Sequence, residues 1–201
     1  MGAEAFRTRR EPEALADDGY YGTATALAAY ESLDDEVFPR DGIAASARAQ
    51  LATGTHTFGR YIGQAQAYTA VGPLVPFARI AAAHITSGGP PHRVFALGGI
   101  GLSPLLPAQQ FDLAGYRAEA LAGRSIALGS VGVRWDAGGG RHLSAQVDGA
   151  RIGSAFDALD TFGGWGVVAS QETPLGPLEL AAFGRGDDEP LAFQLALGYR
   201  F

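Results

Sequence analysis

The final segment of the chain alternates strictly between apolar residues and small or polar ones. Successive side chains of a β-strand point to opposite faces, so this alternation predicts a strand with one fully apolar face. The other face carries alanine, glutamine, glycine and arginine. The apolar positions are Leu191, Phe193, Leu195, Leu197, Tyr199 and Phe201.

Weaker alternation recurs from Gly22 onward, in segments close to the 9–11 or so residues that a tilted strand needs to cross a bilayer. Turn-like residues separate nearly all of these segments, and the 29 glycines and 11 prolines favour short strands over a helical bundle. The sequence therefore predicts an all-β protein. The nine predicted strands span residues 22–33, 43–52, 58–71, 77–87, 125–135, 141–152, 162–172, 177–184 and 191–201.

The segment over residues 141–150 shows the same alternation in a second form. Small or apolar residues occupy one face, and polar residues occupy the other. We expect the polar face to line a wet lumen. Its residues are His142, Ser144, Gln146 and Asp148.

The segment over residues 125–135 loses the rhythm at its centre. Ile126 and Leu128 are out of phase with Val131 and the apolar residues that follow it. A β-bulge near Gly129 would bring both groups to one face. We therefore predict a bulge at that position.

A soluble up-and-down barrel or a β-sandwich would also show alternating strands. Two features favour a membrane-spanning barrel instead. The polar faces are small and glycine-rich, and aromatic residues occur near strand ends, where membrane barrels place their aromatic girdles. The chain has no apolar stretch of roughly 18 residues, so no transmembrane helix is predicted. The aromatic residues near strand ends are Tyr30, Trp135, Tyr199 and Phe201.

The predicted connections differ greatly in length. Residues 174–177 form a tight turn, whereas residues 88–124 form one very long connection. Short turns on one side of the membrane and long loops on the other are typical of outer-membrane barrels. Residues 1–10 lack the apolar core of an export signal, so we expect a fragment, with a lead-in at residues 1–21 and a barrel segment at residues 22–201.

Composition narrows the classes of partner. A net charge of −6 and a pI near 5.1 weigh against nucleic acid, because neutralising phosphates requires clustered basic residues. All 15 basic residues are arginines, which we attribute to coding bias. The chain has no cysteine, so disulfides and thiolate chemistry are excluded.

Several motifs resemble the C-terminal barrel of the bacterial surface antigen superfamily. Residues 30–42 are similar to a family hairpin in which a Leu-Asp pair precedes Phe-Pro-x-x-Gly. Residues 95–99 and 113–116 resemble the glycine pair and the Arg-Gly-aromatic tip of the family's long inward loop. Residues 173–178 and 197–201 resemble its last turn and closing strand.

This resemblance implies an antiparallel transmembrane β-barrel in the bacterial outer membrane. The chain would be the C-terminal half, with about 8–9 strands of a barrel of about 16. The implied partners are outer-membrane lipid, the barrel assembly machinery and upstream domains of the same parent protein, with no nucleic acid. The long connection at residues 88–124 would fold inward.

The tip of the long loop separates the branches of the family. Insertases carry an arginine before the tip glycine, where this chain has Ala114. Patatin-linked barrels have a looser tip and then a Leu-x-Gly element, which residues 121–123 resemble. We therefore favour the anchor and translocation barrel of a patatin-like phospholipase autotransporter. The alternatives are the barrel of an insertase or secretion pore, and a small self-contained barrel that acts as an adhesin or ligand binder.

The resemblance also assigns two groups of candidate residues. The first forms the inward loop motif, and the second forms the terminal signal that the assembly machinery reads. The loop residues are Gly98, Gly99, Leu113, Gly115 and Tyr116, and the signal residues are Leu197, Tyr199 and Phe201.

The sequence predicts no catalytic, cofactor or metal site in this segment. A patatin enzyme needs a Gly-x-Ser-x-Gly elbow, which is absent, although residues 138–141 and 148–150 imitate its oxyanion loop and its aspartate motif. Residues 99–101 lack the third glycine of a dinucleotide loop, and residues 34–36 are typical of a solvated turn. The histidines show no zinc spacing. They are His56, His84, His92 and His142.

Overall fold

The computed structural model describes residues 21–54, 56–89, 94–99, 110–117, 120–185 and 190–198. Regular structure within these ranges is entirely β. No helix in the described part of the chain is long and apolar enough to cross a membrane. The main sheet contains β1 (Tyr21–Glu31), β2 (Gly42–Gly54), β3 (Phe58–Tyr68), β4 (Leu74–Ile85), β8 (Ser125–Gly138), β9 (Arg141–Ala155), β10 (Ala158–Gln171), β11 (Leu178–Gly184) and β12 (Ala192–Leu197).

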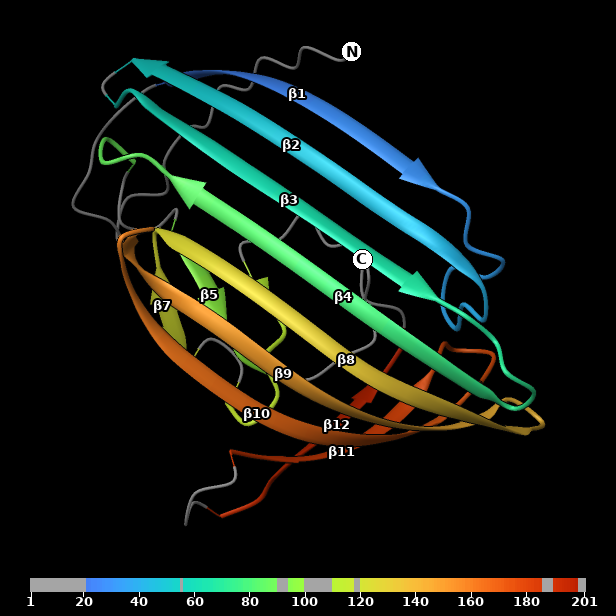
Figure 1. Cartoon of the computed structure of the whole chain (residues 1–201). Helices are drawn as coiled ribbons and strands as arrows, with labels where there is room; N and C mark the ends of the chain where they lie inside the picture. The colour runs from blue at the N-terminus through green and yellow to red at the C-terminus, as the bar shows by residue number, and fades with distance from the viewer. Residues whose placement is uncertain are drawn as a thin grey trace.

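These nine strands form one antiparallel sheet in the order β1-β2-β3-β4-β8-β9-β10-β11-β12. The sheet curves into an open wall, with β1 and β12 at its two edges (Figure 1). Each strand matches one predicted from the sequence, with ends that differ by a few residues. The prediction of an all-β, antiparallel architecture is confirmed.

Side chains alternate between the concave inner face and the convex outer face of the wall. On β9, inward Asp148 is 2% exposed, whereas outward Val147 is 60% exposed. On β12, Phe193, Leu195 and Leu197 all point outward and are exposed. The alternation read in this segment is therefore confirmed as far as Leu197, whereas residues 199–201 lie outside the described residues.

The wall has two ends, named here by their connections. The loop end carries the connections at residues 55–57, 86–124, 156–157 and 185–191, and the turn end carries those at 32–41, 69–73, 139–140 and 172–177. The expected separation of short turns from long loops is only partly met, because the loop end also carries the short connections at residues 55–57 and 156–157.

The outer face has aromatic borders and a mostly aliphatic middle, in which exposed Trp165 also lies, in register with Val147. Tyr30 and Trp135 lie toward the turn end and are exposed, as predicted for a girdle. Tyr61 and Phe156 are exposed near the loop end. Between the two borders lie Ile80, Val131, Val147, Val167 and Leu195, all of them outward and at least 36% exposed. This surface has the pattern of a membrane barrel.

The prediction of a bulge near Gly129 is wrong. Gly129 pairs in register with both neighbouring strands, and the irregularity between β8 and β9 lies at the turn end instead. Ile126 is fully buried on the inner face and Leu128 is half-buried there, while Val131 is 60% exposed on the outer face. The strand therefore keeps its period, and what changes along it is which face is apolar.

The long connection between β4 and β8, residues 86–124, contributes a second, smaller sheet. It consists of β5 (Phe95–Leu97), β6 (Gln110–Phe111) and β7 (Leu121–Gly123) in the order β6-β5-β7. Strand β5 runs parallel to β6 and antiparallel to β7. The small sheet lies on the concave side of the wall (Figure 1).

Candidate functional site

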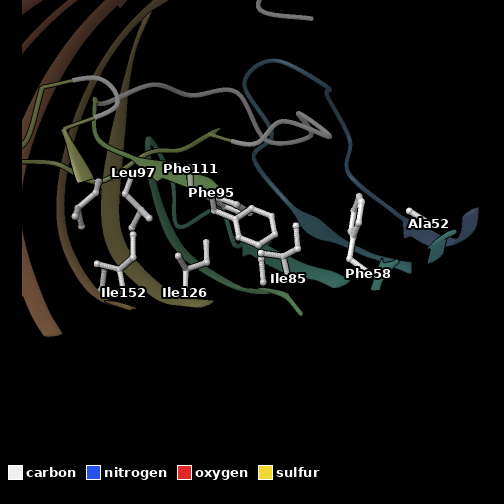
Figure 2. Packing of buried hydrophobic residues seen from close by; sticks show 11 residues of the cluster. Ala52, Phe58, Ile85, Phe95, Leu97, Phe111, Ile126 and Ile152 are labelled. Atoms are coloured by element: carbon white, nitrogen blue, oxygen red, sulfur yellow. The ribbon is translucent and has the colours of Figure 1, made fainter. Parts of the chain in front are cut away.

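An apolar cluster holds the long connection against the inner wall at the loop end (Figure 2). Phe95 and Leu97 of β5 share one face because they are two residues apart, and both are fully buried. Burying side chains of this size contributes roughly 1.5–3 kcal/mol each. The buried members of the cluster are Ala52, Phe58, Ala83, Ile85, Phe95, Leu97, Phe111, Leu113, Ile126, Ala150 and Ile152.

The glycine pair and the loop tip predicted from the sequence bind each other. The N–H of Gly98 donates to the carbonyl of Phe111 at 3.0 Å, and the N–H of Gly99 donates to the carbonyl of Tyr116 at 2.8 Å. The N–H of Leu113 donates back to the carbonyl of Gly99 at 3.0 Å. These hydrogen bonds close the tip into a compact unit, so the predicted loop residues do form one cluster.

Glycine is required at three of these positions. Gly98, Gly99 and Gly115 have φ angles of 136°, 85° and 90°, which side-chain-bearing residues rarely adopt. A Cβ atom at Gly98 would lie 1.9 Å from the carbonyl oxygen of Arg117, and one at Gly115 would lie 2.8 Å from that of Gly184. Backbone conformation and close packing therefore both select glycine in the loop motif.

The tip is joined to the wall by a buried carboxylate. The N–H of Ala114 donates to Oδ2 of Asp148 at 2.7 Å. The Gln146 amide donates to both oxygens of the same carboxylate at 3.0 Å, and Arg79 donates to Gln146 at 2.7 Å. Asp148 thus faces inward as expected, but the loop covers it, so the prediction of a wet lining is wrong here.

Two wall residues that complete the site were not singled out from the sequence. Asp148 was identified only as an inward residue and as part of a motif that imitates the patatin aspartate, and Gly164 was not identified as a contact site. A Cβ atom at Gly164 would lie 1.9 Å from the carbonyl oxygen of Ala114, so the tip backbone rests on this glycine. Consecutive glycines inside a predicted strand were the available signal, because glycine there often marks a close approach by another backbone.

The aromatic residue of the tip packs between two wall elements. Tyr116 makes an edge contact with Phe162, with ring centroids 5.8 Å apart. The guanidinium of Arg185 lies 4.7 Å from the centre of the Tyr116 ring, a cation–π distance. Leu121, from the predicted Leu-x-Gly element, packs against the apolar cluster. The whole motif therefore lies against the inner wall.

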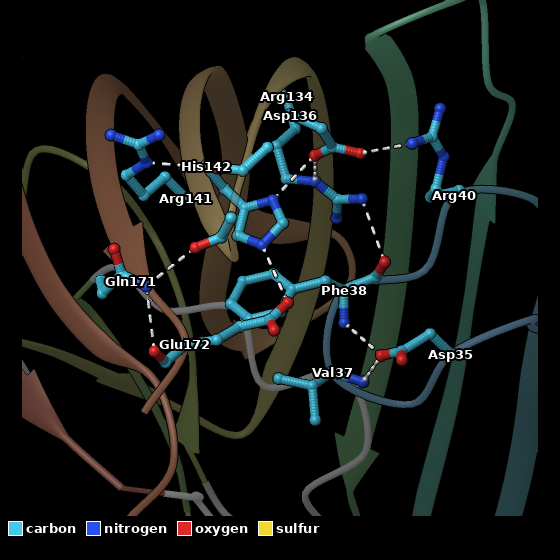
Figure 3. Close-up of polar contacts among 12 residues, drawn as sticks. Asp35, Val37, Phe38, Arg40, Arg134, Asp136, Arg141, His142, Gln171 and Glu172 are labelled. Atoms are coloured by element: carbon cyan, nitrogen blue, oxygen red, sulfur yellow. Dashed lines mark hydrogen bonds and ion pairs between the residues drawn. The ribbon is translucent and has the colours of Figure 1, made fainter. Parts of the chain in front are cut away.

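A polar cluster holds a second segment against the wall at the turn end (Figure 3). Arg134, which is 2% exposed, donates to Oδ1 of Asp136 at 2.7 Å and to the carbonyls of Phe38 and Pro39 at 3.0 Å. Arg40 adds an ion pair with the other Asp136 oxygen at 3.4 Å. One buried guanidinium therefore ties the connection at residues 32–41 to β8.

His142 extends this cluster across the wall. Its Nδ1 lies 2.8 Å from Asp136 and its Nε2 lies 3.1 Å from Glu172. Its ring stacks on Phe38, with centroids 4.0 Å apart. Phe38 is itself held by a hydrogen bond from its N–H to the Asp35 carboxylate at 2.7 Å. The Phe-Pro hairpin motif thus covers the inner wall at the turn end.

The aspartates of the same connection accept hydrogen bonds from backbone N–H groups. The Asp34 carboxylate accepts hydrogen bonds from the N–H groups of Arg40 and Asp41 at 2.8 and 3.1 Å. Burial acts to raise the pKa of Asp34, but these and other backbone hydrogen bonds outweigh it and lower the pKa below its ordinary value. This local hydrogen bonding fits the turn predicted for residues 34–36.

The remaining chemistry-bearing residues are scattered. Within the described ranges, no group of three or more His, Asp or Glu residues could hold a metal ion. His84 contacts Ser125 on the outer face, at 2.8 Å, and His92 lies outside the described residues. Leu197, from the predicted assembly signal, is the last residue of β12 and points outward, whereas Tyr199 and Phe201 lie outside the described residues.

Comparison with known proteins identifies similar barrels. A family model described as the OMP85 superfamily matches residues 2–201. Among solved structures, the crystal structure of BamA from Haemophilus ducreyi lacking POTRA domains 1–3 superposes with a TM-score of 0.71 at 13% sequence identity. The match covers 89% of this chain and 41% of the BamA chain, so this chain spans less than half of that structure. The likeness at this identity is one of fold, and no curated protein matches.

Proposed function

Because this chain belongs to the OMP85 superfamily, we propose that it is the closing part of an outer-membrane barrel that anchors the protein and helps to translocate the rest of it. The chain is a bacterial outer-membrane β-barrel domain with the fold of part of the BamA barrel. A domain of this type is not an enzyme. What it exposes to lipid is the apolar outer face of the wall.

The observation that carries the proposal is the docked loop tip. Leu113 and Ala114 are fully buried against the inner wall, and the Ala114 N–H reaches the Asp148 carboxylate. A loop held inside the barrel by a charge-assisted hydrogen bond reduces the open cross-section of the lumen and braces the wall. We propose that Gly98, Gly99, Leu113, Gly115 and Tyr116 act together as this brace.

The open edges support the proposal that the chain supplies only part of the barrel. Backbone N–H and C=O groups at a membrane-exposed sheet edge are unsatisfied unless another strand pairs with them. Within the described residues β1 and β12 do not pair with each other. We propose that residues 22–201 form a barrel segment, that residues 1–21 lead into it, and that further strands of the same protein complete the wall.

We also propose a passenger for this barrel, a patatin-like phospholipase domain upstream in the same protein. The support is the loop sequence, in which Ala114 replaces the insertase arginine and residues 121–123 follow as a Leu-x-Gly element. A lipase assay on the full-length protein, together with a Gly-x-Ser-x-Gly motif upstream, tests this proposal. A parent protein that has neither would rule out the passenger while leaving the barrel intact.

A second candidate function, the barrel of an insertase or secretion pore, is favoured by the likeness to BamA. The absence of the tip arginine weighs less against it than the sequence suggests. The backbone N–H of Ala114 donates a hydrogen bond to the Asp148 carboxylate, so the tip is anchored without a guanidinium group. We propose outer-membrane lipid and the barrel assembly machinery as partners under either function.

One experiment separates the two functions. In cells that produce the full-length protein with Asp148→Ala, protease treatment of intact cells reports surface exposure of the protein's own upstream part. Immunoblots of unrelated barrels report insertase function. Loss of surface exposure alone supports anchoring and translocation, whereas loss of the other barrels supports the insertase.

Asp160→Ala is the matched control, because Asp160 is an exposed carboxylate at the loop end of β10. It should change neither readout. If Asp148→Ala also changes neither readout while heat-modifiable gel mobility shows a folded barrel, the docked loop has no part in function and the proposal fails.

A further inference from the structure

The outer face carries a groove near the turn end that neither the loop nor the polar cluster explains. The groove has a volume of about 500 Å³, and its lining includes Leu143, Leu178, Leu180 and Leu195, with Ala169 between them. All five side chains belong to the outward set of β9 to β12. A cavity of this size and lining is in the range of small-ligand sites.

One side chain gives the groove a charged rim. Arg141 is the first residue of β9, lines the groove and is exposed. Its Nε donates to the Gly138 carbonyl at 3.1 Å, which fixes the base of the guanidinium group. No ion pair joins Arg141 to a carboxylate among the described residues, and Figure 3 shows its guanidinium turned away from Asp136.

The location of Arg141 fits the boundary between hydrocarbon and headgroups. Trp135, whose outward ring is 47% exposed, lies in register opposite Leu143 and marks the aromatic border at this end. Arg141 lies beyond Leu143 toward the turn. A phosphate at the headgroup level would therefore be level with the guanidinium, while an acyl chain would be level with the leucines.

We propose that this groove binds one anionic phospholipid, with the phosphate on Arg141 and an acyl chain between the leucines. A planar guanidinium matches phosphate geometry and charge, and a leucine-lined groove matches a hydrocarbon chain. This occupant follows from the charge at the rim and from the location of the domain in the outer membrane. The inference depends on neither the patatin passenger nor the insertase alternative.

A second groove, over β1 to β4, serves as a comparison for the charge selectivity proposed for the first groove. It has a volume of about 630 Å³ and an outer lining dominated by alanine, with Tyr61, His84 and Phe156 toward the loop end. Arg48 also lines this groove, but it belongs to the inward set of β2, in register with Ile62, so the outward rim offers aromatic rings and an imidazole in place of a guanidinium group. Annular lipid of any headgroup would fill it, so charge selectivity is expected at the first groove alone.

The test uses tryptophan quenching by brominated lipid in the full-length protein. The chain has two tryptophans, so Trp165→Phe leaves Trp135 as its reporter beside the groove. Where upstream domains contain tryptophan, those residues are replaced by phenylalanine too. Vesicles of phosphatidylcholine receive increasing fractions of brominated phosphatidylglycerol or brominated phosphatidylcholine. We expect phosphatidylglycerol to bind beside Trp135 more tightly, by about fivefold.

Arg141→Gln should abolish this preference. The matched control is Arg151→Gln, because Arg151 is exposed and outward on the same strand but lies at the loop end. Persistence of the preference in Arg141→Gln overturns the proposal, as does an equal loss in Arg151→Gln, which would indicate general surface charge. Displacement of the brominated lipid by millimolar inorganic phosphate would also overturn it, because the site would then recognise phosphate without the chain.

The groove itself is tested by Ala169→Leu, which fills its floor from an exposed, outward position. We expect weaker quenching by both brominated lipids and unchanged heat-modifiable mobility. Unchanged quenching would mean that no acyl chain lies in the groove and would overturn that half of the proposal. Ala137→Leu, from another lining position, repeats the test should Ala169→Leu fail to fold.

Discussion

The two ends of the inner wall hold their covering segments by different kinds of contact. At the loop end, Phe95 and Leu97 are buried among aliphatic and aromatic side chains. At the turn end, one buried guanidinium, Arg134, donates to a carboxylate and two backbone carbonyls. The loop end depends on the volume of its buried side chains, and the turn end depends on the hydrogen-bond partners of Arg134. The two ends should therefore respond differently to the same kind of substitution.

This difference also explains the composition of the inner face. An apolar contact is non-directional and accepts many shapes of similar volume, so its residues can come from wall and connection alike. A buried polar contact is costly unless every member is satisfied. Asp136 is accordingly contacted by Arg134, Arg40 and His142 together.

The largest effect is expected for Phe95→Ala. It removes a fully buried ring from the apolar cluster and should lower the free energy of unfolding by about 3–5 kcal/mol, measured by urea denaturation in lipid vesicles. Phe95→Leu should recover much of the loss because it restores volume. Phe193→Ala, at an outward position exposed to lipid, is the control, and an equal loss there would contradict the role of burial.

Arg134→Leu should cost about 3 kcal/mol in the same assay, because it leaves Asp136 and two carbonyls without their main donor. The double variant Arg134→Leu with Asp136→Leu should recover part of the loss, because it also removes the buried carboxylate that the single variant leaves without its donor. This recovery would not come from restored packing volume. Arg40→Leu, at a half-exposed ion pair, should cost under about 1 kcal/mol. If the double variant has a lower free energy of unfolding than the single variant, the turn end is held by packing, like the loop end, and not by paired polar groups.

Gly98→Ala tests whether the loop end also depends on backbone conformation. We expect a loss of about 1–3 kcal/mol, since the φ angle is positive and the added Cβ meets the Arg117 carbonyl. Gly72→Ala is the control, because Gly72 also has a positive φ but open space around its Cβ position. Equal losses at the two sites would show that close packing at the loop motif contributes nothing.

Asp34→Ala should have the smallest effect, about 0.5 kcal/mol at neutral pH, because solvent can replace the exposed carboxylate. The pKa of Asp34 is lowered in the folded protein, so its contribution is present above the ordinary value of 3.8 and is lost as pH falls through the lower folded value. The difference in unfolding free energy between the two proteins should therefore vanish in that acidic range. A difference that grows on acidification would contradict the assignment.

The wall was predictable from sequence because a strand that faces lipid on one side repeats every two residues. The strict alternation from Leu191 to Leu197 therefore fixes both the strand and its outward face. The error at Gly129 has the same origin. Ile126 and Leu128 are apolar on the inner face because the long connection covers them, and a periodicity within one strand carries no information about what covers it.

The site was only half predictable for a related reason. The loop tip could be identified from local motifs, since Gly98, Gly99 and Gly115 impose backbone conformations that few residues allow. Their partners on the wall, Asp148 and Gly164, are distant in sequence and take their role from the folded arrangement. Arg134 and Phe38 are likewise 96 residues apart.

The position of Gly164 has a consequence for the order of assembly. Within the loop tip, Ala114 and Gly115 contact three wall residues that all come later in the chain: Asp148 on β9, Gly164 on β10 and Gly184 on β11. These contacts close long loops of the chain. Such contacts form late in folding, because the chain loses the entropy of loop closure before the contacts begin to stabilise the fold. The contacts of Ala114 and Gly115 are therefore complete only after β11 is in place, whereas the apolar cluster that includes Leu113 already has members on β2, β3 and β4.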